Sequence, residues 1–100
     1  RLLVKHLQNH PHFNLIKTNK ELFMEGSTMH HCVYNYLEKI QRGGSTIWKY
    51  ERQKHRYTVE IEKRKYGNYE VVQCYGKYDS LPDKQELDEI KKVVRAIPYK

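Results

Sequence analysis

The chain has 100 residues, of which 38% are hydrophobic, and its 19 Lys and Arg outnumber 12 Asp and Glu to give a formal net charge of +7. A chain of this length buries only about two-thirds of the surface that its unfolded form exposes, so it has room for one core and not for two domains. The positive charge favours a polyanionic partner, either DNA or RNA, although charge that only keeps a small domain soluble gives the same composition.

The first residues are predicted to form a short helix. Three leucines recur at helical spacing, and Pro11 disfavours helical backbone at the residue before it, so the helix gives way to a turn there. We expect residues 1–13 to be a linker or short helix that leads from a longer parent protein into a single domain at residues 14–100. Residues 13–16 are expected to form a brief strand or an extended lead-in.

Two helices are predicted next, separated by a glycine. Asn19 caps a short helix, which Gly26 ends in the left-handed conformation. Ser27 or Thr28 then caps a longer helix, which a pair of glycines ends. The apolar stripe of this longer helix consists of Met29, Val33, Tyr36, Leu37 and Ile40.

The second half of the chain is predicted to be a β-meander followed by a helix. Three runs rich in β-branched and aromatic residues have the composition of strands, at residues 45–50, 56–63 and 69–75. Short turns join them, so the strands are antiparallel neighbours. Asp83 caps a last helix together with Glu86, and Pro98 closes it. The predicted fold is α+β, a three-stranded antiparallel β-meander with two N-terminal helices and one C-terminal helix packed on one face.

The sequence HHC, which ends at Cys32, lies where the longer helix is predicted to begin, and several interpretations of it are open. Cys32 is at the edge of the apolar stripe, which favours a small buried hydrophobe. Alternatively, the positive end of the helix dipole stabilises a reactive thiolate at Cys32. Because adjacent side chains on a helix diverge, the base that accepts the thiol proton would have to be His12 or His55. Zinc would require Cys32, Cys74 and two histidines, but no CxxC or HxxxH pair is present, so we predict no metal and no cofactor.

Two polar residues stand in otherwise apolar strands. Val59 belongs to an apolar strand face that we expect to pack on the helices, which leaves Glu60 facing solvent or a groove. Gln73 must find hydrogen-bond partners if it is buried, and we expect these at a helix end or in a loop.

Basic residues concentrate between residues 39 and 65, where they alternate with aromatic ones. Such a mixture suits phosphate contacts beside rings on which bases stack, so it predicts a nucleic-acid-binding surface. The predicted residues are Arg42, Trp48, Lys49, Tyr50, Arg52, Lys54 and Arg56. A charged hairpin that only keeps an edge strand soluble is the structural alternative.

Several separated motifs together resemble the PcfJ-like domain family of conjugative plasmids, phages and related mobile elements. They are an EG pair, an HCV run with a tyrosine three places on, a strand acid, and an ending similar to QxxGxxN. The matching residues are Glu25, Gly26, His31, Cys32, Val33, Tyr36, Glu60, Gln73 and Gly76. Asp79 stands where the family pattern has Asn, so a carboxylate that only accepts hydrogen bonds replaces an amide. The resemblance covers residues 14–79 and implies a bacterial mobile-element protein without a settled activity.

Two functions of different classes follow from these patterns. The first is a basic binding module that docks on DNA, on RNA or on other domains of a larger transfer or phage protein; the motif residues are then mainly structural, with His31 hydrogen-bonded across to the sheet. The second is a thiol or acid–base enzyme with His31, Cys32, Glu60 and Gln73 as catalytic candidates. We expect a cytoplasmic location without membrane contact, because the chain shows no secretory leader and no apolar run long enough to span a bilayer.

Overall fold

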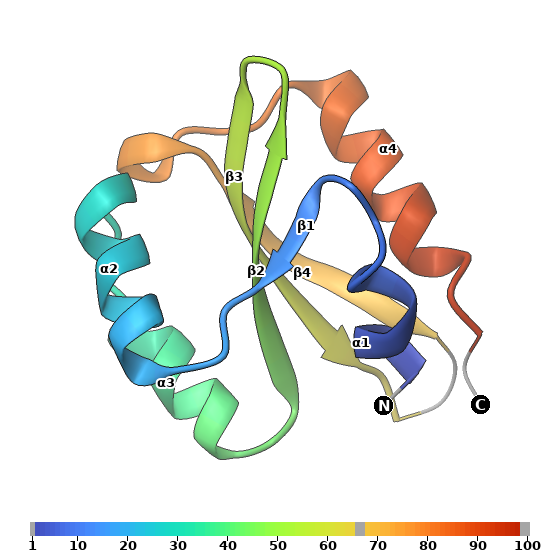
Figure 1. Cartoon of the computed structure of the whole chain (residues 1–100), viewed down its shortest axis with the longest axis horizontal. Coiled ribbons are helices and arrows are strands. Elements are labelled where there is room, and N and C mark those ends of the chain that lie inside the picture. Colours follow the sequence, from blue (N-terminus) through green and yellow to red (C-terminus); the bar gives the residue numbers. More distant parts are fainter. Residues whose placement is uncertain (1, 66–67, 99–100) are drawn as a thin grey trace.

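A four-stranded antiparallel sheet runs through the middle of the molecule in the computed structural model, which describes residues 2–65 and 68–98 (Figure 1). Its strands, in spatial order, are β1 (Phe13–Leu15), β2 (Ser45–Arg52), β3 (His55–Lys63) and β4 (Tyr69–Tyr75). The three predicted strands are confirmed as β2, β3 and β4. The predicted number of strands is wrong, because β1 pairs with β2, Phe13 lying opposite Tyr50. The turn predicted between β3 and β4 falls on residues 66–67, outside the described residues.

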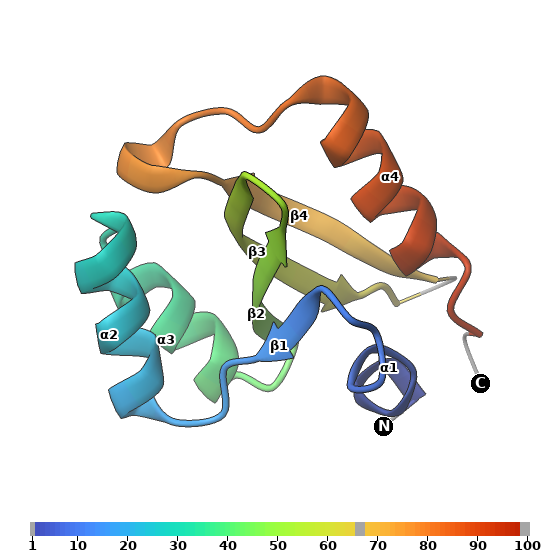
Figure 2. The ribbon, with the colours of Figure 1, turned by 45° about the horizontal axis from the view of Figure 1, so that its top comes forward.

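Helices cover both faces of the sheet. The helices are α1 (Leu2–Leu7), α2 (Asn19–Met29), α3 (Tyr34–Gln41) and α4 (Lys84–Arg95), with a short 3-10 helix η1 (Lys77–Asp79) after β4. Figures 1 and 2 show α2 and α3 on one face and α1 and α4 on the other. The prediction of a single covered face is therefore wrong. In β3 every residue from 57 to 61 is buried, and a strand buried at consecutive positions must have cover on both sides.

The α1/α4 face of the sheet holds the larger apolar core. Its members include Trp48 and Val59 from the strands and Ile90 from α4. Leu3 and Leu7 of α1 belong to the same core, at 2% and 1% exposed. The expected linker or short helix at the start of the chain is thus a short helix that packs on the sheet.

The α2/α3 face combines a smaller apolar cluster with two buried carboxylates. The cluster consists of Ile16, Leu22, Val33, Tyr36 and Ile47. Glu25 of α2 accepts hydrogen bonds from the side chains of Arg56 and Thr58 on β3. Glu60 is fully buried and accepts from Ser45 Oγ at 2.7 Å and Lys39 Nζ at 3.2 Å. The expectation that Glu60 faces solvent or a groove is wrong, because α3 covers its face of the sheet and supplies the lysine.

The break between α2 and α3 differs from the prediction. Thr18, not Asn19, caps α2, which continues through Gly26 and ends before His30, a residue in the left-handed conformation with φ 57°. Gly26 is required for close packing instead of a turn, since a Cβ there would lie 2.5 Å from Val33 Cγ1. Residues 30–33 therefore form a loop between two helices.

The C-terminal helix agrees with the prediction. Asp83 caps α4 by accepting a hydrogen bond from the Glu86 amide, and Pro98 follows shortly after the last helical residue. Of the helices within the described residues, none has the length and apolar character needed to cross a membrane.

Candidate functional site

An open cleft of about 390 Å³ lies where the start of α3, the end of β4 and η1 meet. Its walls are formed by Cys32, Asn35, Tyr36, Gln73, Tyr75 and Asp79, and we call it the α3–β4 cleft. Most of these residues occupy motif positions of the family pattern described above. Segments more than 35 positions apart in the chain thus bring their motif residues into one cleft.

A contact between His31 and Asp79 ties the α2–α3 loop to η1. His31 Nδ1 lies 2.6 Å from Asp79 Oδ1, with the histidine side chain 1% exposed and the aspartate side chain 65% exposed. The carboxylate only accepts, so Nδ1 carries the proton. The Nε2 atom is the buried side-chain nitrogen without a hydrogen-bond partner in the described part of the chain. The predicted bond from His31 to the sheet is therefore made to η1 instead.

Left-handed backbone conformations gather around this contact. His30, Tyr78 and Asp79 have φ values of 57°, 58° and 58°, and the remaining non-glycine residue of this kind in the described residues is Gln53 in the β2–β3 turn. Each such conformation costs about 1–2 kcal/mol for an ordinary residue. Strain of this kind persists where the surrounding structure enforces it, typically at ligand sites, so it marks the cleft as a candidate functional site.

Two exposed aromatic rings stack beside the cleft. The His30 and Tyr78 rings lie 4.2 Å apart with an interplanar angle of 9°, and Tyr78 is 69% exposed. Lys77 Nζ lies 5.9 Å from the centre of the Tyr78 ring. The pair presents a flat aromatic surface next to a positive charge.

The polar groups inside the cleft differ in their freedom to bind a ligand. Gln73 is partly buried and Asn35 is exposed, and neither side-chain amide has a hydrogen-bond partner among the described residues. The bond predicted from Gln73 to a helix end or loop is therefore absent. Burial, followed by the carboxylates of Glu60 and Asp79, raises the pKa of the Tyr36 hydroxyl, which stays protonated.

Cys32 is exposed, so its interpretation as a small buried hydrophobe is wrong. The reason is that α2 ends before it and α3 begins after it, which leaves the residue in the loop. The predicted bases His12 and His55 line a different cleft, against α4, and are not positioned beside the thiol. No group of three or more His, Cys, Asp and Glu side chains within residues 2–65 and 68–98 is arranged to hold a metal ion.

The predicted nucleic-acid-binding residues do not form one surface. Trp48 and Tyr50 are 0% and 2% exposed, so their rings belong to the core and cannot stack on bases. Arg52 and Arg56 pair with the buried carboxylates of Glu86 and Glu25, whereas Arg42 pairs with the exposed Glu38 at the end of α3. Lys49 and Lys54 remain without a carboxylate partner in the described residues.

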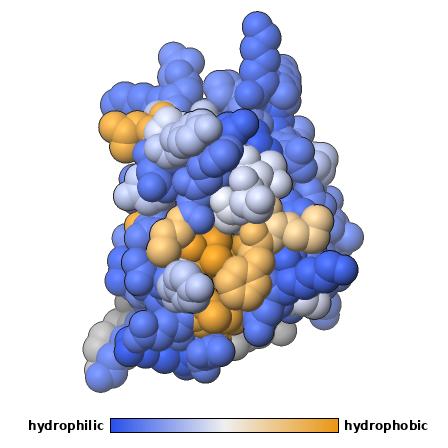
Figure 3. Space-filling view, turned by 90° about the vertical axis from the view of Figure 1, so that its left-hand side faces the viewer, coloured by the Kyte–Doolittle hydropathy of each residue, from blue (hydrophilic) through white to orange (hydrophobic). Residues whose placement is uncertain are grey.

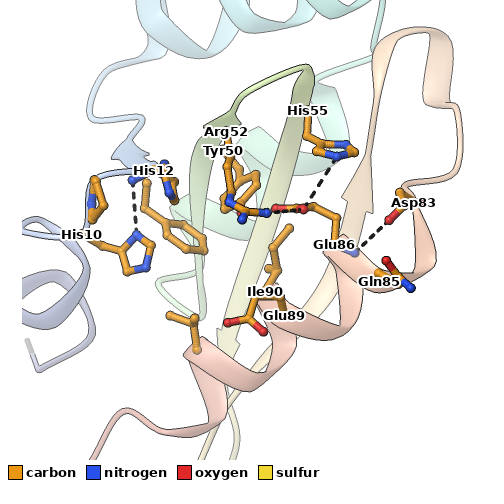
Figure 4. Close-up of a pocket in the computed structure, with 13 residues that line it drawn as sticks. His10, His12, Tyr50, Arg52, His55, Asp83, Gln85, Glu86, Glu89 and Ile90 are labelled. Carbon is orange, nitrogen blue, oxygen red and sulfur yellow. Dashed lines mark hydrogen bonds and ion pairs between the residues drawn. The ribbon is translucent and has the colours of Figure 1, made fainter.

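A second cleft, of about 510 Å³, lies between the β2–β3 hairpin and α4 (Figure 4). Glu86 is buried there and accepts hydrogen bonds from the Tyr50 hydroxyl and from Arg52 Nη1, the latter at 2.9 Å, with His55 Nε2 at 3.7 Å. Because its carboxylate is already satisfied, this arrangement fastens α4 to the sheet. The sequence indicated Glu86 only as part of a helix cap, not as a residue of this cleft. Tyr75 of the α3–β4 cleft could have been predicted from its spacing, because it lies two places after Gln73 on the same strand face.

Apolar side chains are also exposed on the side of α2 and α3. Figure 3 shows them gathered in the middle of that face with polar residues around them. Phe23 and Met24 of α2 are 46% and 59% exposed.

The fold and the cleft define a small basic α+β domain whose separated polar motif residues converge at one edge of the sheet. The family model described as PcfJ-like protein matches residues 3–91, so the chain belongs to the PcfJ-like protein family. The match includes α1 and most of α4, beyond the region of the resemblance noted above. Searches of curated proteins and of solved structures found no match.

Proposed function

We propose that this domain is a binding module for single-stranded nucleic acid within a mobile-element protein of the conjugation or phage type, and that it binds at the α3–β4 cleft. The observation that carries the proposal is the combination of unpartnered amides inside the cleft with an exposed pair of stacked rings beside it. A nucleobase has a flat face and an edge of donors and acceptors, and it needs both kinds of surface at once.

The positive charge supports the same ligand class. A net charge of +7 attracts a phosphate backbone at long range, and Lys77 stands beside the proposed stacking surface. Single strands are favoured over duplexes because bases within a duplex cannot reach rings or amides in a cleft.

Oligonucleotide titrations test the proposal. Fluorescence anisotropy with labelled single-stranded and duplex oligonucleotides should show tighter binding of the single strand, with an affinity that falls as salt rises. Tyr78→Ala should weaken single-strand binding about 5- to 150-fold, since one stacked base contributes about 1–3 kcal/mol.

A pair of lysine variants separates site binding from general attraction. Lys77→Ala and Lys54→Ala remove the same charge, one beside the stacked rings and one in the β2–β3 turn, which does not line the cleft. Site binding predicts a larger loss for Lys77→Ala. Equal small losses in both lysine variants, with no effect of Tyr78→Ala, would leave only nonspecific attraction by a basic protein and refute the proposal.

A thiol or acid–base enzyme is the second candidate, and the exposure of Cys32 in the same cleft as Tyr36 and Gln73 favours it. His31, which Asp79 orients, is the candidate base for this alternative, but its Nε2 atom is buried without a hydrogen-bond partner in the described residues, so the enzyme requires the thiol to move towards it. A thiolate nucleophile would keep reacting with iodoacetamide down to about pH 6, and His31→Gln would remove that reactivity. Alkylation that stops below about pH 7.5, as for an ordinary thiol, in both proteins counts against an enzyme.

A further inference from the structure

The carboxylate of Asp79 is held in one orientation at the α3–β4 cleft. Its Oδ1 atom accepts the Nδ1 proton of His31, whose own side chain is 1% exposed and cannot turn freely. Its Oδ2 atom has no partner among the described residues, and the side chain is 65% exposed. One free carboxylate oxygen therefore stands in a fixed position on the wall of the cleft.

Asp79 differs chemically from the other polar groups of this cleft. The amides of Asn35 and Gln73 offer both donors and acceptors, and the tyrosine hydroxyls can rotate to donate or accept. An ionised carboxylate has only acceptors. Asp79 is thus the group in the cleft that can distinguish ligands by whether they present a donor.

Nucleobases differ in this respect. Cytosine and adenine carry an exocyclic amino group and guanine presents an amino group beside a ring N–H, all of which donate to a carboxylate. Thymine and uracil present one ring N–H between two carbonyl oxygens, and those oxygens repel a carboxylate.

We infer that Asp79 makes the α3–β4 cleft selective for bases that carry an amino group over thymine and uracil. The inference rests on the proposed binding of single strands at this cleft. An amide both donates and accepts, so Asp79→Asn should accept either kind of base.

The test compares dC and dT oligonucleotides of equal length, which have the same ring size and backbone. The wild-type domain should bind oligo-dC at least about fivefold more tightly than oligo-dT, the lower limit for one well-placed hydrogen-bonded pair. Asp79→Asn should bring the ratio close to one, mainly by raising the affinity for oligo-dT. Asp88→Asn, which removes an exposed carboxylate on α4, is the matched control and should raise both affinities without changing their ratio.

The possible outcomes separate the two proposals. Absence of binding to any oligonucleotide overturns the proposed function and the selectivity with it. Equal binding of oligo-dC and oligo-dT by the wild-type domain overturns the selectivity and leaves the function standing. A ratio that is unchanged in a folded Asp79→Asn variant, verified by circular dichroism, removes Asp79 as its source. If that variant does not fold, equal binding of the two oligonucleotides by the wild-type domain still overturns the selectivity.

Discussion

Replacement of Arg56 by methionine is predicted to destabilise the domain because the guanidinium neutralises a buried carboxylate. Glu25 is 1% exposed and the Arg56 side chain 27% exposed. Arg56 donates to Glu25 and also, at 2.9 Å, to the carbonyl oxygen of Tyr57. In Arg56→Met the carboxylate of Glu25 keeps only the hydroxyl of Thr58 as a side-chain donor.

The size of the effect follows from burial. Removal of one partner of a buried ion pair costs about 3–5 kcal/mol, and the partial exposure of Arg56 places this case near 3 kcal/mol. Domains of this size have a total stability of about 5–15 kcal/mol, so the variant stays folded at room temperature. Its Tm should fall by about 12–24 °C, measured by circular dichroism. Lys54→Met, at an exposed residue without a partner, should change the free energy of unfolding by at most about 0.5 kcal/mol.

A double-mutant cycle identifies the cause. Glu25→Gln removes the charge that Arg56 neutralises, so the double variant should be about 1–3 kcal/mol more stable than the sum of the single effects predicts. A loss below about 1 kcal/mol in Arg56→Met, or a cycle without coupling, would refute the structural role and return Arg56 to the candidates for ligand contact. Until the stability is known, weak nucleic-acid binding by any variant that lacks Arg56 does not report on a binding surface.

Three further outcomes are expected from the packing. Gly26→Ala should lower the free energy of unfolding, measured in urea, by about 1 kcal/mol, because the clash with Val33 outweighs the gain in helix propensity. Gly44→Ala, with open space around its Cβ position, should lose no stability. Equal effects of the two substitutions would contradict this reasoning. A thiol reagent should label Cys32 at once, because it is exposed, and Cys74 only after unfolding. Rapid labelling of two thiols per folded chain would contradict the burial of Cys74. Burial raises the pKa of the Cys74 thiol from 9.0 to about 12, so the unfolded chain loses this proton first and stability should fall as pH rises from 9 towards 12. Urea unfolding at successive pH values measures this, and Cys74→Ala should flatten the decline.

Elements with strong local patterns were predictable from the sequence. The runs that became β2, β3 and β4 have a strand composition that needs no distant partner, and Asp83 with Glu86 marks the start of α4 by spacing alone. For β1 the sequence left a brief strand and an extended lead-in both open, because three residues are too few to show alternation. Its place in the sheet depends on pairing with a strand more than 30 positions later.

The errors occur where distant residues decide the local structure. Gly26 has a sequence signal for a helix end, but its lack of a side chain serves the approach of Val33. Glu60 alternates with apolar residues and so was expected on an outer face; its partners Lys39 and Ser45 lie 21 and 15 positions away. The roles of the arginines in the basic stretch were hard to predict for the same reason, since a sequence does not show which cations pair with buried carboxylates in the fold.

The residues of the candidate site could be predicted from the family resemblance, but not from their spacing in the sequence alone. Cys32, Gln73 and Asp79 belong to different segments, and no period links them. The sequence named the motif residues without showing that Asn35 joins them. It also gave no sign of the stacked His30 and Tyr78 rings, because that contact depends on left-handed backbone in two separate loops.

The two faces of the sheet are built by different interactions, and this difference bears on the cleft. The α1/α4 face is held by apolar packing, which tolerates changes that conserve volume. The α2/α3 face, where the cleft lies, is held in addition by hydrogen bonds. Lys39 and Ser45 donate to the buried carboxylate of Glu60, and Arg56 donates to that of Glu25. Satisfied networks of this kind rigidify their surroundings, whereas a half-satisfied one is costly. The Lys39 bond to Glu60 fixes α3 against the sheet beside the cleft, and the His31 contact fixes Asp79, which is the condition under which a free oxygen of Asp79 can distinguish one ligand edge from another.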